Sequence, residues 1–203
     1  MPEQSRRDEL LTLAARLFAE HGYRSTTVRD IADAAGILSG SLYHHFDSKE
    51  SMADEILGGF LDELFGTYAE IVRTGLGPRK TLEAVVVASF EAIDAHPDEV
   101  AIYQNEAKQL AKLPRFSYIE RRNTEFRKLW TELLAEGVRE GAFRPELNVE
   151  LTYRFIRDTV WVAVHWYDPK GPLSADEVAQ EYLAIVLDGI ATRRRPAKRR
   201  PDG

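Results

Sequence analysis

The sequence predicts an all-α protein of about nine helices, in which an N-terminal three-helix module precedes a larger helical domain. Apolar residues recur at spacings of three and four along most of the chain, and capping residues, prolines or glycines stand at the ends of these runs. No stretch alternates apolar and polar residues as a half-buried β-strand would. With 203 residues the chain can bury one large core, or a small module beside a larger domain.

The composition is that of a globular protein, with 44% hydrophobic and 30% charged residues. There is no cysteine, which excludes disulfides, zinc–thiolate sites and thiol catalysis. No run approaches the roughly 18 apolar residues that a membrane-spanning helix needs, and the N-terminal segment lacks the order of features of a signal peptide. We therefore expect a cytoplasmic protein with no membrane partner and no bound metal.

The net charge of −6 gives no general attraction to nucleic acid. Six of the 27 lysines and arginines lie between residues 193 and 200, so the rest of the chain is more acidic than the total suggests. Contacts with phosphates must then come from a few placed groups, such as Arg29, hydroxyls and helix N-termini. We expect residues 193–203 to be a basic disordered tail, with auxiliary DNA contact as the alternative.

The first predicted helix begins at a cap on Ser5 and ends at Gly22. Asp8 stands three residues after Ser5, as in a capping box. Apolar residues then follow at helical spacing: Leu10, Ala14, Leu17 and Phe18. We interpret this stripe as part of the core of the N-terminal module.

A second, short helix is predicted from a cap at Thr27. Asp30 is its third residue, so the Thr27 hydroxyl and the Asp30 carboxylate can satisfy each other's backbone amides. Ile31 and Ala35 then lie on one apolar face. Gly36 ends the helix, because a positive φ costs glycine little.

A third helix of about two turns starts at Ser39. Leu42 and Phe46, four residues apart, can anchor one side, while the residues between are small, polar or aromatic with polar tips. Gly40 costs a helix interior about 1 kcal/mol relative to Ala, so its presence suggests that a partner approaches the backbone closely. The pair of short helices has the spacing of a helix-turn-helix, whose second helix enters the major groove of DNA.

A long helix, capped by Asp47 or Ser48 and reaching about residue 74, connects this module to the rest of the chain. Its apolar residues recur every four positions from Met52 to Leu64. Five further helices are expected, over residues 81–95, 97–114, 118–140, 149–166 and 174–190. Residues 160–166 and 183–187 are apolar on nearly all sides of their helices, so both faces of the last two helices must be buried. They could be buried against a partner subunit or in the core of a monomer.

Between residues 10 and 49 the chain resembles the TetR family of bacterial transcriptional regulators. An incidental helical hairpin with a polar second helix is the alternative. The resemblance rests on Phe18, Gly22, Thr26, Thr27, Ile31, Ala32, Gly36, the run from Gly40 to Phe46, and Lys49. It implies a DNA-binding domain over residues 1–47, a ligand-binding and dimerisation domain over residues 48–192, and no enzymatic activity.

The resemblance also implies a homodimer in which the last two helices pair with their twofold mates. Two recognition helices then lie about one DNA turn apart, so double-stranded DNA with an approximately palindromic operator is the expected partner. Expected contacts with phosphate or sugar come from Thr26, Thr27, Tyr43, His44 and Lys49. Expected contacts with base edges come from Leu38, Ser39, Gly40 and Ser41, with Leu38 suited to a thymine methyl group.

Arg157 and Trp161 are the strongest candidates for binding a ligand. They lie four residues apart on a predicted helix and so share a face. A guanidinium beside an indole can hold an anion while the ring stacks on a flat or alicyclic body. The alternative is an arginine paired with Glu150, Asp158 or Glu106 beside a packing tryptophan.

Residues 29–46 and 153–162 closely resemble actinobacterial TetR-type repressors of cholesterol catabolism. This resemblance spans residues 6–190 and implies that Arg157 and Trp161 contact an acidic effector, a coenzyme A thioester of a bicyclic steroid ring-degradation product; no cofactor is implied. Other candidate ligand-binding residues are Phe60, Tyr103, Gln104, Arg115, Arg122 and Trp130. By this interpretation, ligand among the helices favours a conformation in which the long helix displaces the DNA-binding module.

Three alternatives remain from the sequence. A TetR-type multidrug sensor would have an aromatic and acidic pocket for lipophilic cations, and Arg157 counts against it. A fatty acyl-coenzyme A sensor would also bind a thioester. A helical enzyme would rely on Glu106 and His165, which lie on different helices with no nucleophile or phosphate loop beside them.

Overall fold

The computed structural model describes residues 3–188, and within them the chain forms nine α-helices, two 3₁₀-helices and no strand. The basic segment 193–203 and the expected end of the last helix lie outside the described residues. The elements are α1 (Glu3–His21), α2 (Val28–Ala34), α3 (Ser39–Leu42), α4 (Lys49–Arg73), α5 (Pro78–Ala95), α6 (Pro97–Leu110), η1 (Pro114–Phe116), α7 (Tyr118–Arg139), α8 (Val149–Trp161), η2 (Val162–His165) and α9 (Ala175–Asp188).

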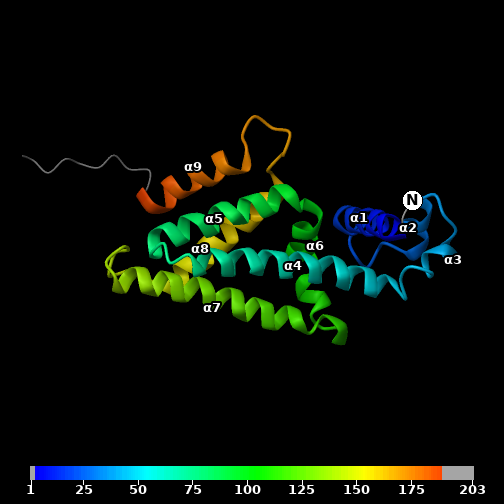
Figure 1. The fold of residues 1–203 in the computed structure, drawn as a ribbon, viewed down its shortest axis with the longest axis horizontal. Helices are drawn as coiled ribbons and strands as arrows, with labels where there is room; N and C mark the ends of the chain where they lie inside the picture. Colours follow the sequence, from blue (N-terminus) through cyan, green and yellow to red (C-terminus); the bar gives the residue numbers. More distant parts are fainter. Residues whose placement is uncertain (1–2, 189–203) are drawn as a thin grey trace, which may run out of the picture.

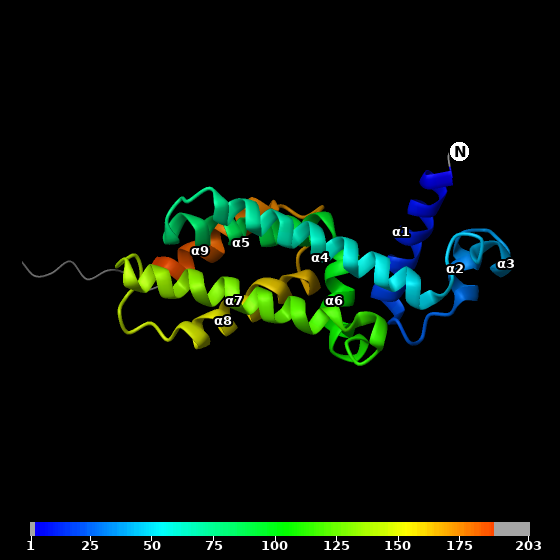
Figure 2. The same ribbon diagram turned by 60° about the horizontal axis from the view of Figure 1, so that its bottom comes forward.

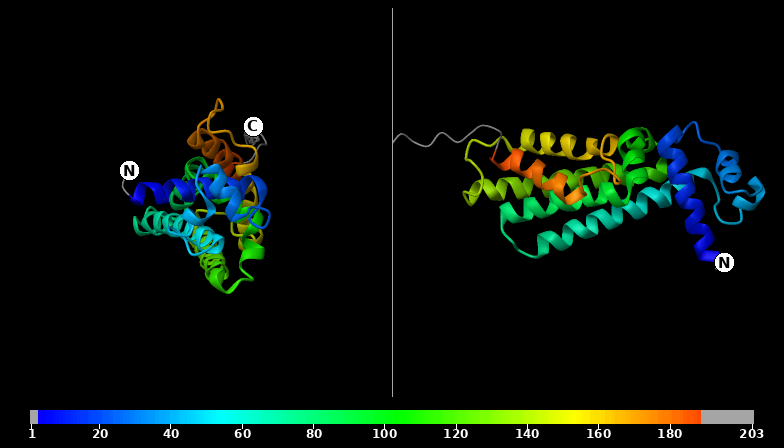
Figure 3. Two further views of the ribbon diagram at one scale, coloured as in Figure 1. Left: turned by 90° about the vertical axis from the view of Figure 1, so that its right-hand side faces the viewer. Right: turned by 90° about the horizontal axis from the view of Figure 1, so that it is seen from above.

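The molecule is elongated, with α1, α2 and α3 at one end (Figure 1). Helix α4 starts at that end and continues into the other part of the molecule, where it packs on α5. Helix α1 crosses α4 at a steep angle, and α6 lies between α1 and the helices of the second part (Figure 2). Helix α9 packs on α5, and α8 packs on α7 (Figure 3). The expected all-α architecture is confirmed.

Two of the expected helix starts and one expected turn are confirmed in detail. Thr27 and Asp30 form a complete capping box at α2, with Thr27 N to Asp30 Oδ2 at 2.7 Å and Asp30 N to Thr27 Oγ1 at 3.2 Å. Ser48 caps α4 and exchanges hydrogen bonds with Ser51. Gly36 has a φ of +68°, as the turn between α2 and α3 requires.

Other helix ends differ from the expectation. Helix α1 begins at Glu3, so Ser5 lies inside the helix and is not its cap. Helix α3 is one turn rather than two, because i to i+3 hydrogen bonds such as His44 N to Ser41 O follow Leu42. Helix α5 begins three residues early at Pro78, a favoured first position for proline.

The α-helical part of the segment expected over residues 149–166 ends at Trp161. It continues as the 3₁₀-helix η2, whose tighter winding changes the direction in which the following side chains point. The helix expected from residue 97 ends at Leu110, before η1.

Two apolar cores are present, and α4 and α6 contribute to both. The first core holds Leu10, Phe18, Ile31 and Leu42, and it also contains Ile102 and Leu110 of α6, Phe116 of η1 and Ile119 of α7. The second core lies among α4, α5, α7, α8 and α9. The N-terminal unit, here α1 to α3 with the start of α4, is thus closed by side chains from the second part of the chain. The domain boundary expected at residues 47 and 48 stays a prediction.

Candidate nucleic-acid interface and ligand cavity

Helix α3 presents one buried and one exposed side. Leu42 and Phe46 are buried in the first core, as expected from their spacing. Leu38 is 80% exposed and Tyr43 is 56% exposed, although both are large. His44 is also exposed. This side of α3 therefore presents apolar and aromatic side chains to the outside, where a partner could contact them.

Gly40 lies on the exposed side of α3 without an internal reason to be glycine. A Cβ atom built at this position meets no described atom within 4 Å, and the backbone is not in the left-handed region. Packing and local conformation would therefore accept alanine. A glycine at this exposed position would let an outside partner approach the backbone of α3 closely.

Thr26 requires a correction. Its side chain is only 1% exposed, and its hydroxyl lies 3.0 Å from the Gly22 carbonyl oxygen and 3.1 Å from that of Leu17. The hydroxyl holds the end of α1 against the segment leading to α2, so the side chain is not available for the expected contact with DNA. The neighbouring Thr27 is exposed and caps α2.

Lys49 has an intramolecular role in addition to the phosphate contact that we expect of it. Its ammonium donates to the carbonyl oxygens of Tyr23 and Thr26, both at 2.7 Å, and lies 4.4 Å from the centre of the Tyr23 ring. Burial lowers the pKa of Lys49, and the carboxylates of Asp30 and Glu106 oppose this effect. The ammonium joins the start of α4 to the connection between α1 and α2. Its contact with phosphate stays a prediction.

The main cavity lies among α4, α6, α7 and α8 and has a volume of about 670 Å³. This is within the ordinary range for sites that bind small molecules. Its residues come from four helices, so its shape depends on how these helices pack. Its lining is Phe60, Leu61, Leu64, Phe65, Tyr103, Gln104, Ala107, Lys108, Ala111, Glu120, Asn123, Thr124, Phe126, Arg127, Tyr153, Arg157, Asp158 and Trp161.

Arg157 and Trp161 both line the main cavity, as their spacing indicates. The guanidinium pairs with Asp158, with Nε to Oδ1 at 2.7 Å, and lies 5.5 Å from the centre of the Tyr153 ring. Burial alone would lower the pKa of Arg157, but hydrogen bonds with Asp158 and Tyr153 outweigh it and raise the pKa, so the group is cationic. Asp158 is an exposed neighbour, and an anionic ligand can therefore compete with it for the guanidinium.

Of the six other expected ligand residues, three line the main cavity and three do not. Phe60, Tyr103 and Gln104 line the cavity. The Tyr103 hydroxyl donates to the side-chain oxygen of Asn123, and burial raises the pKa of Tyr103 to about 12, so the phenol is neutral. Trp130 does not line the cavity but lies in the second core, which is a correction; Arg115 and Arg122 do not line the cavity either, and their contact with a ligand stays a prediction.

The partners of these three residues explain why none of them lines the cavity. Arg115 pairs with Asp54 and Glu50 on the outside of α4. Arg122 pairs with Asp62 and Glu125, and its guanidinium lies 5.0 Å from the centre of the Phe65 ring. Trp130 is 1% exposed and belongs to the second core. The basic or aromatic character of these three residues was therefore not sufficient to predict that they line the cavity.

Several lining residues were not among the expected ones. In the sequence, nothing distinguishes Phe126 from an ordinary apolar residue of a helix. The only signal at Tyr153 is its position four residues before Arg157, which places both on one helix face. Phe126 lies at the centre of an aromatic group. Its ring centre is 6.0 Å from those of Phe65 and Trp130, 5.8 Å from that of Tyr68 and 6.2 Å from that of Trp161.

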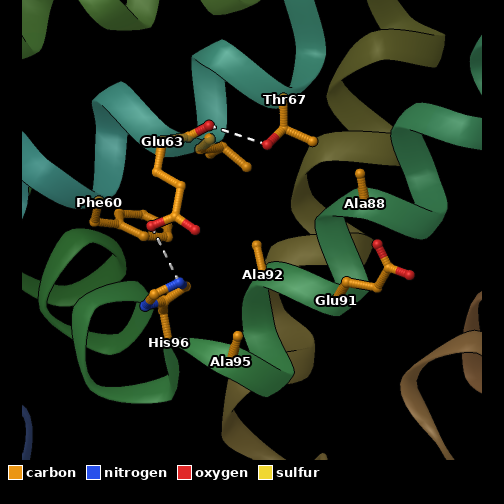
Figure 4. A pocket seen from close by; sticks show the side chains of 9 residues that line it. Phe60, Glu63, Thr67, Ala88, Glu91, Ala92, Ala95 and His96 are labelled. Carbon is orange, nitrogen blue, oxygen red and sulfur yellow. Dashed lines mark hydrogen bonds and ion pairs between the residues drawn. The ribbon is translucent and has the colours of Figure 1, made fainter. Parts of the chain in front are cut away.

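A smaller groove of about 170 Å³ lies between α4 and α5 (Figure 4). Glu63 and Thr67 of α4 face Glu91 of α5 and His96 just beyond it, and His96 Nε2 is 3.5 Å from a Glu63 carboxylate oxygen. Its carboxylates would repel an anion, and its volume is below that of typical ligand sites. The main cavity is therefore the candidate ligand site. In the described part of the chain no group of acidic, histidine or cysteine residues is arranged to hold a metal ion, and no helix is long and apolar enough to span a membrane.

Two family models match the chain. Residues 10–56 match "Bacterial regulatory proteins, tetR family", and residues 75–190 match "Tetracyclin repressor-like, C-terminal domain". The chain is 63% identical over 190 residues to the HTH-type transcriptional repressor KstR2 of Rhodococcus jostii, which covers 94% of this chain and 93% of the relative. It is 62% identical over 186 residues to KstR2 of Mycobacterium tuberculosis, covering 92% and 93%.

A solved structure shares the same fold. The ketosteroid transcriptional regulator KstR2 of Mycobacterium tuberculosis superposes with a TM-score of 0.89 and 61% sequence identity, covering 93% of this chain and 96% of that one. The agreement extends over both the N-terminal unit and the helices around the main cavity.

The exposed backbone at Gly40 gives a test of the nucleic-acid interface. Gly40→Ala should leave the free energy of unfolding unchanged or raise it by about 1 kcal/mol, because nothing in the chain opposes a methyl group there. Binding to duplex DNA should weaken by about tenfold, since a steric clash at an interface costs on the order of 1–3 kcal/mol. Fluorescence anisotropy with the promoter fragment that the wild-type chain protects measures the second effect.

Gly59→Ala is the matched control. Gly59 is exposed on α4, also has no described atom within 4 Å of a built Cβ, and lies away from α3. It should leave DNA binding unchanged. Equal DNA affinities of the Gly40→Ala variant and the wild type would contradict the assignment of this surface.

Proposed function

The chain belongs to the TetR family of bacterial regulatory proteins, and we propose that it represses genes of steroid ring degradation until a coenzyme A thioester from that degradation occupies the main cavity. The observation that carries the proposal is that Arg157 and Trp161 line the same aromatic cavity, in a chain about 62% identical to KstR2 repressors. Because its target is chromosomal DNA, the protein acts in the cytoplasm.

The lining of the main cavity supports an effector with an apolar ring body and an anionic part. Phe60, Phe65, Phe126 and Trp161 supply apolar walls with flat faces. Three cations, Lys108, Arg127 and Arg157, line the cavity beside two carboxylates, Glu120 and Asp158, so the lining carries a net positive charge. A coenzyme A thioester of a ring compound meets both requirements, since its nucleotide part is polyanionic and its acyl part is apolar.

Exposed apolar residues on α8, just after η2 and on α9 support the expected homodimer. Phe155 is 63% exposed, Trp166 59% and Ile185 55%. Regulators of this family form dimers, and a twofold pairing through these helices would cover the three side chains. Two N-terminal units held in one dimer can span the half-sites of an approximately palindromic operator.

Helix α6 joins the main cavity to the N-terminal unit. Gln104 and Lys108 line the cavity, while Ile102 and Leu110 are buried in the first core. Glu106, also on α6, accepts a hydrogen bond from Tyr23 N at 3.3 Å. Any shift of α6 that makes room for a ligand therefore moves side chains that hold the connection between α1 and α2.

The same connection is held from the other side by α4. Lys49 donates to the Tyr23 and Thr26 carbonyls, and the Tyr23 ring packs on Phe18 and Phe116, with ring centres 5.4 Å and 6.5 Å away. Gly22 has a φ of +86°, and a Cβ there would lie 3.1 Å from the Glu106 carboxylate. We infer that ligand binding shifts the population toward a conformation in which the two N-terminal units no longer match the half-sites.

The alternatives are less well supported. A multidrug sensor for lipophilic cations fits poorly with a cavity in which three cations outnumber two carboxylates. A fatty acyl-coenzyme A sensor would bind the same anionic coenzyme A part, but the flat aromatic walls of the cavity favour a ring body over a straight acyl chain. The protein is not an enzyme: its relatives are named transcriptional repressors, and the Glu106 carboxylate is engaged by a backbone amide.

Isothermal titration with a coenzyme A thioester of a bicyclic alkanoate tests the effector class. Arg157→Met should weaken binding roughly ten- to hundredfold, because a hydrogen bond to a charged group contributes about 1.5–3 kcal/mol. Trp161→Leu should also weaken it by removing the stacking face. Octanoyl-coenzyme A should bind the wild type more weakly than the bicyclic thioester.

Arg154→Met serves as the control for charge and helix stability. Arg154 lies on α8 one turn before Asp158, pairs with Glu150 at 3.3 Å and does not line the cavity. It should retain the affinity of the wild type. Affinities that are unchanged in Arg157→Met, or lowered equally in both arginine variants, would contradict the proposed role of Arg157.

Glu106→Ala tests the connection between cavity and N-terminal unit. The variant should bind the thioester nearly as the wild type does. In the wild type the thioester lowers the affinity for the operator by a certain factor, and in the variant this factor should be roughly 2- to 30-fold smaller. That decrease corresponds to a loss of about 0.5–2 kcal/mol of coupling free energy. Operator titrations with and without thioester measure this factor. Asn105→Ala, at an exposed position on the same helix, should leave it unchanged. If the thioester lowers operator affinity by the same factor in Glu106→Ala as in the wild type, the connection through α6 is contradicted.

A further inference from the structure

Helix α3, the predicted recognition helix, is too short to fix its own direction. It has only four residues, Ser39–Leu42. A helix of this length is not stable in water by itself, so contacts at its two ends have to hold it in place. The start of α1 lies at the same end of the molecule as α2 and α3 (Figure 1), and it carries two neighbouring arginines, Arg6 and Arg7. One of them contacts the segment before α3 and the other the segment after it.

Arg6 holds the turn that leads into α3. Its guanidinium donates to the Ala35 carbonyl oxygen at 2.9 Å and to Glu9 of the same helix at 2.8 Å. Ala35 is the C-terminal cap of α2 and directly precedes the turn at Gly36, whose own amide bonds the Asp33 carbonyl at 3.1 Å. Carbonyl groups at the end of a helix lack partners within it, and a cation there also interacts favourably with the helix dipole. Arg6 therefore fixes the end of α2 relative to α1.

Arg7 contacts the segment that follows α3 and joins it to α4. Its guanidinium carbon lies 4.5 Å from the centre of the Phe46 ring, which is buried in the first core. Both terminal nitrogens of the guanidinium donate to the carboxylate oxygens of Glu55 on α4, with Nη2 to Oε2 at 2.6 Å. Hydrogen bonding with Glu55 raises the pKa of Arg7, so the group is cationic. A bidentate pair of this kind has a defined geometry, so the position of Arg7 over the ring depends on α4.

We propose that Arg6 and Arg7 are positioning residues for DNA binding. Together they hold α3 at the angle in which its exposed side meets the operator, and Arg7 links this angle to α4. Both guanidiniums act through a backbone carbonyl, a ring or a carboxylate of the chain itself, and not through a contact with phosphate. The inference rests on the DNA-binding role of α3, which Gly40→Ala tests separately.

Glu55→Ala gives a test in which electrostatics and positioning predict opposite signs. Removal of a carboxylate makes the protein less acidic, which by itself strengthens binding to DNA. If Glu55 fixes Arg7, operator affinity should instead fall about 3- to 10-fold, the effect of losing one ordinary hydrogen bond. Glu20→Ala is the matched control, because Glu20 pairs with Arg16 on α1 at 2.9 Å. It should leave operator affinity unchanged or raise it. Fluorescence anisotropy with the same promoter fragment as for Gly40→Ala measures both.

Arg6→Met tests the other end of α3. Operator affinity should fall about 3- to 10-fold, while affinity for a duplex of unrelated sequence should change no more than in Arg16→Met, which loses the same charge from the same helix. The slope of log affinity against log salt concentration should match that of Arg16→Met, whereas loss of a phosphate contact would reduce its magnitude by about 0.9. Arg6→Lys should recover most of the operator affinity, because an ammonium can still donate to the Ala35 carbonyl.

Two further measurements separate orientation from folding. All of these variants should melt within a few degrees of the wild type, because partly exposed ion pairs contribute little to stability. The chain has 13 glycines, so the amide signals of protein labelled with ¹⁵N-glycine are few enough to follow by NMR. Gly36 follows Ala35, and Gly40 lies on α3. Without DNA, Arg6→Met should shift both signals and Arg16→Met should shift neither.

Three kinds of result would overturn the inference. Glu55→Ala could bind the operator as tightly as the wild type or more tightly, or Arg6→Met could weaken binding to both duplexes alike with a smaller salt slope. The Gly36 and Gly40 signals of Arg6→Met could also stay at their wild-type positions. A variant that melts below the assay temperature counts against the inference as well, since its residue would then be needed for folding. If the wild type does not prefer the operator over the unrelated duplex, the proposed function itself fails and the inference with it.

Discussion

Helices α4 and α6 are each built into two cores at once. Both helices line the main cavity, through Phe60 and Leu64 of α4 and Gln104 of α6, and other residues of each helix complete the core of the N-terminal unit. Close-packed cores do not deform continuously, so a change in one of them has to be accommodated by moving whole helices. The orientation of α3 is therefore tied to the occupancy of the cavity.

The N-terminal unit is held in part by groups from the rest of the chain. Its first core is completed by Phe116 and Ile119 from the second part of the chain. The connection between α1 and α2 is held by Glu106 from α6 and by Lys49 from α4, both through backbone atoms of the connection. A net charge of −6 also means that DNA binding depends on a small number of placed contacts, so a small change in geometry can remove a large share of the affinity.

The N-terminal unit could be predicted from the sequence because its signals are local. The capping box of Thr27 and Asp30, the turn at Gly36 and the buried pair Leu42 and Phe46 all depend on residues within a few positions of one another. The cavity was harder to predict because its lining depends on which helices pack together. Arg157 and Trp161 were found by their spacing, whereas Arg115 and Arg122 turned toward carboxylates on α4 that no local pattern identifies. Thr26 was misassigned because its partner carbonyls come from α1 and the segment after it.

Coupling between the cavity and the DNA-binding surface is most directly measured by titrating the thioester into the free dimer and into the dimer bound to its operator. Linkage requires that the thioester binds the DNA complex more weakly than the free protein, by the same factor by which it weakens operator binding. We expect this factor to be about 5 to 150, the usual range for coupled sites. Equal affinities for the free and the DNA-bound protein would show that the two surfaces are independent and would contradict the account.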